Sequence, residues 1–303
     1  MTFGSLFAGI GGFDLGLERA GMECAWQVEI EDFPRRVLEA HWPGLYRPLD
    51  VCDVGGENLD PVDLICGGFP CQDLSVAGKR AGLAGERSGL FFEFMRIVDE
   101  LAPSWVLIEN VLGLLSSNGG RDMGAVLGTL AELGYGYAYR VLDAQFFGVA
   151  QRRRRVFIIG HRGNYECPAK VLFEPESCPR GSPPSRKERK TLASRVAGCA
   201  GADGPIYGIR SANTSSNGWG IQRELSHALD MASPHAVGPT PGFGVVRRLT
   251  PIECERLQGF PDGWTAIDGE NTPDSPRYKA LGNAVCVNVA EWIGRRIMSG
   301  RSA

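Results

Sequence analysis

The stretch Phe7-Ala8-Gly9-Ile10-Gly11-Gly12 lies between a short apolar run at residues 2–7 and a helical pattern at residues 13–19. Glycines at a strand-to-helix turn let the backbone approach a ligand closely, and the N-terminus of the following helix favours negative charge. The stretch is not the dinucleotide fingerprint GxGxxG, because Asp14 stands where the third glycine would be. A purely structural tight turn would have the same pattern, so these residues alone leave the function open.

Strand-like and helix-like segments alternate after this turn. Amphipathic stretches at 90–101 and 123–133 indicate helices, and apolar runs indicate strands at 24–29, 63–66, 105–108, 137–142 and 156–159. This alternation predicts an α/β fold with a Rossmann-like, mostly parallel sheet, in which ligands bind at the carboxyl ends of the strands. Thr250, Pro251 and Glu253 predict a capping box at the start of a helix over 250–257, and a last helix is expected at about 284–298.

Composition narrows the class of protein. The 303 residues are 43% hydrophobic, which is enough for a substantial core and too apolar for a disordered chain. No apolar run approaches the roughly 18 residues of a membrane span, and the first residues carry no basic segment, so we expect a cytoplasmic protein. The nine cysteines form no CxxC pair and the four histidines lack ligand spacing, so we expect no metal site.

Charge is unevenly distributed along the chain. The formal net charge is −3, which by itself argues weakly against nucleic acid as a partner. Between residues 151 and 190, however, eleven lysines and arginines stand against four glutamates. A local basic zone of this kind is compatible with phosphate contact, although a solvated linker would look the same.

Acidic residues lie near two expected strand ends. Glu29 closes the second strand, where a carboxylate often accepts from a ribose hydroxyl, and Asp53 is expected near the next strand end, where it could accept from an adenine amine. Either residue alone would be interpreted as an ordinary carboxylate at the protein surface. Together they suggest a nucleoside cofactor with little phosphate, because the chain has no Walker motif.

Cys71 is the thiol whose position indicates reactivity. It follows the third strand and the sequence Gly67-Gly68-Phe69-Pro70, so it is expected in a loop, whereas the other cysteines are read as inert. Glu109 ends the next strand at the same edge of the sheet, where a turn-capping role is the alternative. Gln151, Arg153 and Arg155 alternate along a strand and therefore share a face that calls for anionic partners, unless they form a solvated cap.

Taken together and in this order, these motifs resemble those of the DNA cytosine-5 methyltransferases of bacterial and phage type. The resemblance extends over nearly the whole chain. Ala284 departs from it, because many members have serine there, but a backbone contact would survive the change. The matching pieces are 7–14, Glu29, Asp53, 68–75, 109–111, 151–155, 248–251, 253–254, 256–261 and 282–285.

The resemblance implies a role for each matching residue. Cys71 would be the nucleophile, Glu109 the partner of cytosine N3, and Arg153 and Arg155 the clamps on base and phosphate. S-adenosylmethionine would be the cofactor, with Phe7 stacked on adenine, Glu29 on the ribose and Asp53 on the adenine amine. The cofactor-binding set is Phe7, Gly9, Ile10, Gly11, Gly12, Glu29, Ile30, Asp53, Val54, Pro70, Leu90, Asn283 and Ala284.

The resemblance also implies an organisation and a substrate. Residues 1–160 and 279–303 would form the catalytic domain, and residues 161–278 a smaller, irregular target-recognition domain. Double-stranded DNA would be the partner, with the target cytosine flipped out of the helix and the enzyme acting as a monomer. Whether a restriction endonuclease accompanies the enzyme is not inferable from the sequence.

Three alternatives stay open at this point. Methylation of tRNA cytosine is one, although residues 161–246 are long enough for a DNA-recognition domain. A catalytically inactive DNA-binding regulator is another, but such a protein would be expected to have lost Cys71 or Glu109. A nicotinamide dehydrogenase is disfavoured by Asp14.

Overall fold

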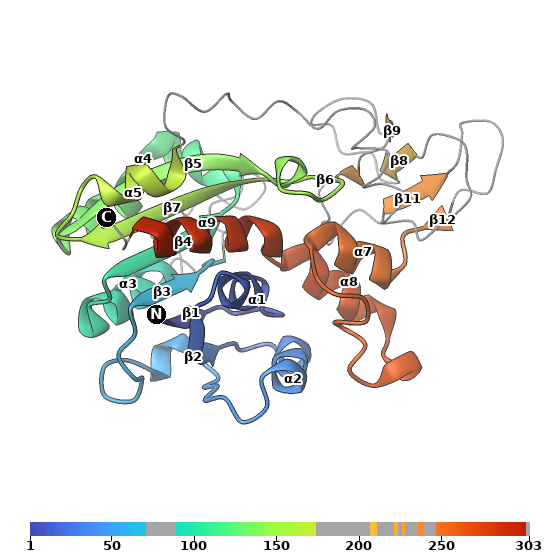
Figure 1. Cartoon of the computed structure of the whole chain (residues 1–303), viewed down its shortest axis with the longest axis horizontal. Helices are drawn as coiled ribbons and strands as arrows, with labels where there is room; N and C mark the ends of the chain where they lie inside the picture. The colour runs from blue at the N-terminus through green and yellow to red at the C-terminus, as the bar shows by residue number, and fades with distance from the viewer. Residues whose placement is uncertain are drawn as a thin grey trace.

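A computed structural model of the chain describes residues 1–70, 89–173, 207–210, 221–223, 226–227, 235–238 and 247–300. Its centre is a six-stranded sheet in the order β2-β1-β3-β4-β7-β5, in which only β7 runs against its neighbours (Figure 1). The predicted mostly parallel α/β sheet is therefore confirmed. The strands are β1 (Thr2–Leu6), β2 (Glu23–Val28), β3 (Leu64–Gly67), β4 (Trp105–Asn110), β5 (Tyr135–Asp143) and β7 (Arg154–Arg162).

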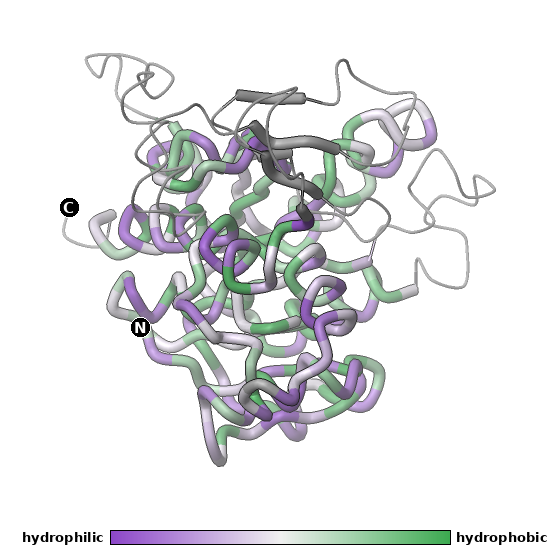
Figure 2. Tube along the Cα trace, turned by 90° about the vertical axis from the view of Figure 1, so that its right-hand side faces the viewer, coloured by the Kyte–Doolittle hydropathy of each residue, from purple (hydrophilic) through white to green (hydrophobic). Residues whose placement is uncertain are grey.

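Helices cover both faces of this sheet because side chains alternate along each strand. In β4, Val106 and Ile108 pack with α3 (Gly89–Leu101) and α4 (Arg121–Glu132). Trp105 and Leu107 point the other way and join a core with α1 (Gly12–Arg19), α5 (Cys167–Leu172) and α9 (Val287–Ser299). Figure 2 shows hydrophobic and hydrophilic residues intermixed along the described chain.

A third core joins the N-terminal part of the chain to its C-terminal part. It lies between α1, α2 (Asp32–His41), α7 (Pro251–Gln258) and α8 (Asp274–Asn283), and Ile10, Leu257 and Leu281 are fully or almost fully buried in it. The predicted capping box of α7 is confirmed, since the Thr250 hydroxyl accepts from Glu253 N and the Glu253 carboxylate accepts from Thr250 N. The sequence analysis missed α2 and α8.

The chain between α5 and α7 adds a second, smaller sheet. β8 (Tyr207–Arg210), β9 (Ile221–Arg223), β11 (His235–Gly238) and β12 (Arg247–Arg248) form it in the antiparallel order β12-β11-β8-β9. β10 (Ser226–His227) pairs instead with β6 (Gln151–Arg152) beside the main sheet. Short 3₁₀ turns are η1 (Val51–Asp53), η3 (Leu112–Leu115), η4 (Ser117–Gly120), η5 (Ala144–Phe146) and η6 (Gly269–Asn271).

A carboxyl group lies fully buried under α1. Asp14 accepts hydrogen bonds from Gln27 Nε2 at 2.9 Å and from Ser5 Oγ at 3.2 Å, and Cys24 Sγ lies 3.6 Å from its Oδ1. Burial raises the pKa of Asp14 from 3.8 to about 6, although these hydrogen bonds act in the opposite direction. The folded protein therefore ionises this group less readily than the unfolded chain does.

Asp14→Asn is expected to stabilise the protein at alkaline pH. Between pH 3.8 and about 6 the unfolded chain releases a proton that the folded protein keeps, so the free energy of unfolding falls as pH rises through this window. Asparagine cannot ionise, so it removes the cost of a buried charge at this position. We expect the free energy of unfolding to rise by about 1–3 kcal/mol at pH 8 and by much less at about pH 4.5, measured by urea unfolding.

Asp122→Asn is the matched control at a second buried aspartate. Asp122, like Asp14, lies in the first turn of its helix, where a negative charge is favourable, and it accepts from Ser117 Oγ. Its replacement should not stabilise the protein at pH 8. A gain for Asp14→Asn that is equal at both pH values would contradict the assignment of the penalty to ionisation.

Candidate active site at the carboxyl edge of the sheet

The glycine turn after β1 is held in a defined shape by backbone hydrogen bonds. Gly11 N donates to Ala8 O at 3.0 Å, and Ala8 N donates to Val28 O of the neighbouring strand at 3.0 Å. Phe7, Gly9 and Gly11 have φ values of 54°, 59° and 84°. A positive φ is uncommon for a residue such as Phe7, so the chain is forced into this conformation where it leaves the sheet.

Glu29 fixes the same turn from the end of β2. One of its carboxylate oxygens accepts from Gly9 N at 2.7 Å, and the other accepts from Glu31 N at 2.8 Å. Glu29 is buried, and burial raises its pKa while the backbone donors oppose that shift. The next residue, Ile30, is 59% exposed. The structure thus brings Glu29 to the glycine turn, with an exposed apolar side chain beside it.

The glycines of the turn serve different purposes. A Cβ on Gly12 would lie 2.4 Å from Val285 O, and a Cβ on Gly11 would lie 2.6 Å from the Trp42 ring. At Gly9 no atom of the described part of the chain lies within 4 Å of such a Cβ. Gly11 and Gly12 therefore allow close packing inside the protein, whereas Gly9 faces open space. The side chain of Ile10 is fully buried in the third core.

The other residues expected at the cofactor differ in their exposure. Asp53 ends the η1 turn and is exposed, while Val54 is buried in the core. Pro70 is exposed, and Leu90, in the first turn of α3, is partly buried. A pocket of about 520 Å³ adjoins Asp53 and Val54, lined also by Cys52, Gly55, Gly56, Glu57, Asn58, Arg96 and Glu100.

Cys71 lies outside the described residues, but the segment that leads to it is described. A Cβ on Gly68 would lie 3.2 Å from Glu109 O and 3.3 Å from Glu109 Oε2. Asn110 Nδ2 donates to Phe69 O at 3.4 Å. The residues that follow β3 thus lie against the end of β4. Gly68, three residues before Cys71, lies against the Glu109 carboxylate.

Glu109 forms an ion pair with Arg155. Arg155 Nε lies 3.1 Å from Glu109 Oε1, and the two side chains are only 20% and 12% exposed. Glu109 pairs across the sheet with Phe157, two residues after Arg155 and on the same face of β7. The structure therefore brings together Glu109 and Arg155, two of the residues to which the resemblance gave catalytic roles.

Arg153 points into the protein. It is 3% exposed, and it donates from Nη2 to Ala284 O at 2.9 Å and from Nη1 to Gly282 O at 3.2 Å. These carbonyls flank Asn283, which is exposed, whereas Ala284 is buried. Arg153 therefore ties the end of α8 to the main sheet, a contact that the sequence analysis did not foresee.

Two further side chains at the site were overlooked. Asn110 holds the Phe69 carbonyl, and Trp264 Nε1 donates to Ile10 O in the glycine turn at 2.8 Å. The Asn110 contact had a signal in the sequence, because Asn110 follows Glu109 at a strand end. No sequence feature indicated the contact between Trp264 and the glycine turn, apart from the place of Trp264 after the helix over 250–257.

No helix among the described residues is long and apolar enough to cross a membrane. Within the same part of the chain, no group of three or more His, Cys, Asp and Glu side chains is arranged to hold a metal ion.

Comparison with known proteins identifies relatives over almost the full chain. The family model for C-5 cytosine-specific DNA methylases matches residues 1–195 and 211–299. The type II methyltransferase M2.BsuMI of Bacillus subtilis is 34% identical over 306 residues, which cover 97% of this chain and 74% of that protein. M.HhaI of Haemophilus parahaemolyticus is 31% identical over 326 residues, with 99% and 94% covered. The S. pombe Dnmt2 methyltransferase structure superposes over both full chains with a TM-score of 0.70 at 16% identity, which concerns the fold alone.

Proposed function

This chain belongs to the C-5 cytosine-specific DNA methylase family, and from that premise we propose how its residues carry out the reaction. The protein is a DNA cytosine-5 methyltransferase. Its substrate is proposed to be a cytosine flipped out of duplex DNA, because the ring carbon to be attacked is covered by stacked neighbours inside the helix. We also propose that the enzyme acts as a monomer.

S-adenosylmethionine is the proposed methyl donor, and when bound it supplies a methyl group on a positively charged sulfur. The residues fit such a molecule: Gly9 faces open space, the Glu29 carboxylate can accept from ribose hydroxyls, and Ile30 offers an exposed apolar surface. Asp53 would accept from the adenine amine and Phe7 would stack on the ring. Backbone at Gly11 and Gly12, with Ile10, Val54, Pro70, Leu90, Asn283 and Ala284, would complete the surroundings.

Cys71 is the proposed nucleophile. Its thiolate would form a bond to C6 of cytosine, and the electrons of the C5–C6 double bond would move to C5, with negative charge spreading towards N3 and O2. C5 would then take the methyl group from the donor, whose S–CH3 bond breaks and which leaves as S-adenosylhomocysteine. Loss of the C5 proton to water and departure of the thiolate restore the double bond and regenerate the enzyme.

Glu109 would act at cytosine N3, where a donor is needed once charge accumulates. It can donate only when it carries or shares a proton, and Arg155 would orient the carboxyl group through the 3.1 Å contact. Arg153 is proposed to act indirectly, by holding the backbone on both sides of Asn283. The observation that carries this scheme is the Glu109 carboxylate against Gly68, three residues before Cys71.

Target recognition is proposed for the region between residues 161 and 278. Its four-stranded sheet supports this, because it is inserted between α5, which packs on β5, and α7. The catalytic domain would consist of residues 1–160 and 279–303.

Expression of the chain in a host that lacks cytosine methylation, followed by bisulfite sequencing, tests the function. We expect 5-methylcytosine in one short sequence context of the host DNA. In vitro, label from methyl-tritiated S-adenosylmethionine should enter duplex DNA and not tRNA. Transfer to tRNA alone, or none with this donor, would overturn the proposed substrate or cofactor respectively.

A further inference from the structure

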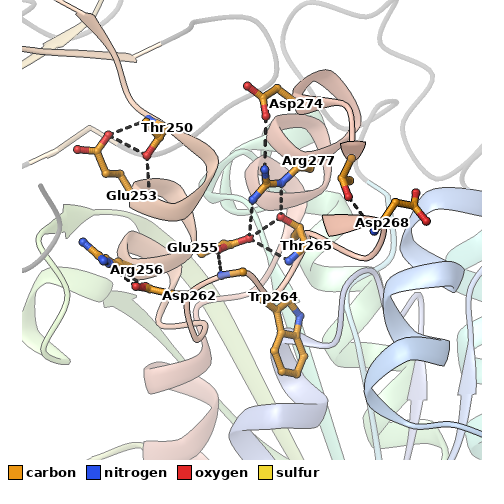
Figure 3. A network of polar contacts seen from close by, with 12 residues as sticks. Thr250, Glu253, Glu255, Arg256, Asp262, Trp264, Thr265, Asp268, Asp274 and Arg277 are labelled. Carbon is orange, nitrogen blue, oxygen red and sulfur yellow. Dashed lines mark hydrogen bonds and ion pairs between the residues drawn. The ribbon is translucent and has the colours of Figure 1, made fainter. Parts of the chain in front are cut away.

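One hydrogen bond connects the C-terminal part of the chain to the glycine turn. The indole Nε1 of Trp264 donates to Ile10 O at 2.8 Å, across a sequence separation of 254 residues. Both partners are buried, since Trp264 is 7% exposed and Ile10 is fully buried. In Figure 3 the Trp264 ring points away from the polar network around Glu255. An unpaired carbonyl at such a position would be unfavourable, so this contact has a structural consequence.

Two hydrogen bonds, one of them from Trp264, hold the peptide unit between Ile10 and Gly11. The carbonyl of the Ile10–Gly11 peptide accepts from Trp264, and its N–H donates to Ala8 O at 3.0 Å. The next carbonyl, Gly11 O, accepts from Leu15 N at 2.9 Å and so begins α1. Trp264 therefore restrains the turn at the point between the open face of Gly9 and the helix N-terminus.

The indole itself is held by aromatic neighbours at the C-terminal end of α2, His41 in its last turn and Trp42 directly after it. Its ring stacks on His41 with a centroid distance of 3.4 Å and an interplanar angle of 3°, and His41 Nε2 lies 2.8 Å from Trp264 O. Trp42 meets the same indole edge-on at 5.6 Å, and its own ring occupies the space beside Gly11. A displacement of Trp264 would therefore also disturb the packing that surrounds the turn.

The backbone on both sides of Trp264 is anchored by one buried carboxylate. Glu255 of α7 is fully buried and accepts from Gly263 N at 2.7 Å and from Thr265 N at 2.9 Å. Arg277 of α8 balances its charge at 3.3 Å (Figure 3). The indole is thus presented by a rigid frame, which is what precise positioning of a partner requires.

We propose that Trp264 is a positioning residue for the cofactor site, which sets the affinity for the methyl donor by holding the Ile10 carbonyl and with it the open conformation of Gly9. This inference rests on the proposed binding of S-adenosylmethionine at the glycine turn. It assigns to the segment after α7 an effect on cofactor binding. Contact with DNA has no part in this assignment.

Trp264→Phe tests the proposal, because phenylalanine keeps an aromatic ring and removes the N–H donor. Isothermal titration of the DNA-free protein with S-adenosylhomocysteine is expected to give a Kd about tenfold higher than wild type, a shift within the range for loss of one buried hydrogen bond. In steady-state assays KM for S-adenosylmethionine should rise by a similar factor. KM for DNA and kcat at saturating cofactor should stay within about twofold.

Thr265→Val is the matched control in the same segment. It removes the hydroxyl that bonds Glu255 and Arg277 but leaves the indole N–H and its acceptor in place. We expect a lower Tm and a Kd for S-adenosylhomocysteine within about twofold of wild type, because the Gly263 and Thr265 backbone N–H groups that flank Trp264 still donate to Glu255. Amide hydrogen exchange of the cofactor-free protein should become faster over residues 8–15 in Trp264→Phe and should not change there in Thr265→Val.

Wild-type affinity in Trp264→Phe, or an equal loss of affinity in Thr265→Val, would overturn the inference. If wild type itself fails to bind S-adenosylhomocysteine, the proposed cofactor falls and the inference falls with it. Should Trp264→Phe not fold, Trp264→benzothienylalanine, which replaces the N–H by sulfur in a ring of nearly the same shape, is expected to give the same tenfold increase in Kd. Wild-type affinity in that variant would refute the role of the N–H.

Discussion

Cys71→Ser is expected to abolish DNA methylation, with a loss of at least about four orders of magnitude in kcat. A thiolate is available near neutral pH, whereas a serine hydroxyl stays protonated and adds far more slowly to an aromatic ring carbon. Binding of S-adenosylhomocysteine should change little, because Cys71 is not among the residues proposed to hold the cofactor. Tritium transfer to duplex DNA under single-turnover conditions measures the loss.

DNA that contains 5-fluorocytosine separates loss of the nucleophile from loss of folding. Fluorine at C5 prevents the final elimination, so a competent thiolate is trapped in a covalent complex that survives denaturing electrophoresis. We expect the trapped complex with wild type and none with Cys71→Ser. Cys52→Ser provides the control at an exposed thiol of the η1 turn and should behave as wild type. A trapped complex with Cys71→Ser would refute the assignment of the nucleophile.

The central sheet was predictable because its strands are apolar on both faces and alternate with helices. The helices α2 and α8 were missed for a local reason. Pro34 and Pro276 stand in their first turns, where a missing N–H is tolerated, although proline reads as a helix breaker in a sequence. The apolar residues of α8 also show little helical periodicity, so periodicity did not indicate a helix there.

The candidate site likewise contains some residues that were predictable from the sequence and others that were not. Glu109 and Arg155 were predictable as site residues, because each lies in a motif that the resemblance singles out, but the 3.1 Å contact between them depends on the register of β4 and β7. The partners of Arg153 and Trp264 were not predictable, since they are main-chain carbonyls 129, 131 and 254 residues away. Every residue has a main-chain carbonyl, so no sequence pattern indicates which carbonyl accepts a given hydrogen bond.

Glu109→Gln is expected to lower kcat by about two to four orders of magnitude, the usual range for loss of a general acid. The amide has nearly the same shape as the carboxyl group but cannot deliver a proton to N3. It also leaves Arg155, whose side chain is 20% exposed, without the carboxylate that now lies 3.1 Å away. Both effects act on the covalent addition, so trapping of 5-fluorocytosine should slow in parallel with methylation.

Arg155→Lys distinguishes these two effects. Lysine keeps the positive charge but has no Nε donor in the place from which Arg155 now contacts Glu109. If orientation of the carboxyl group matters, Arg155→Lys should lose about tenfold to a hundredfold in kcat with little change in Kd for DNA. If the charge alone matters, it should retain wild-type activity. A Glu109→Gln defect confined to DNA affinity would instead remove Glu109 from the chemistry, because a proton donor to the reacting ring must act on the rate.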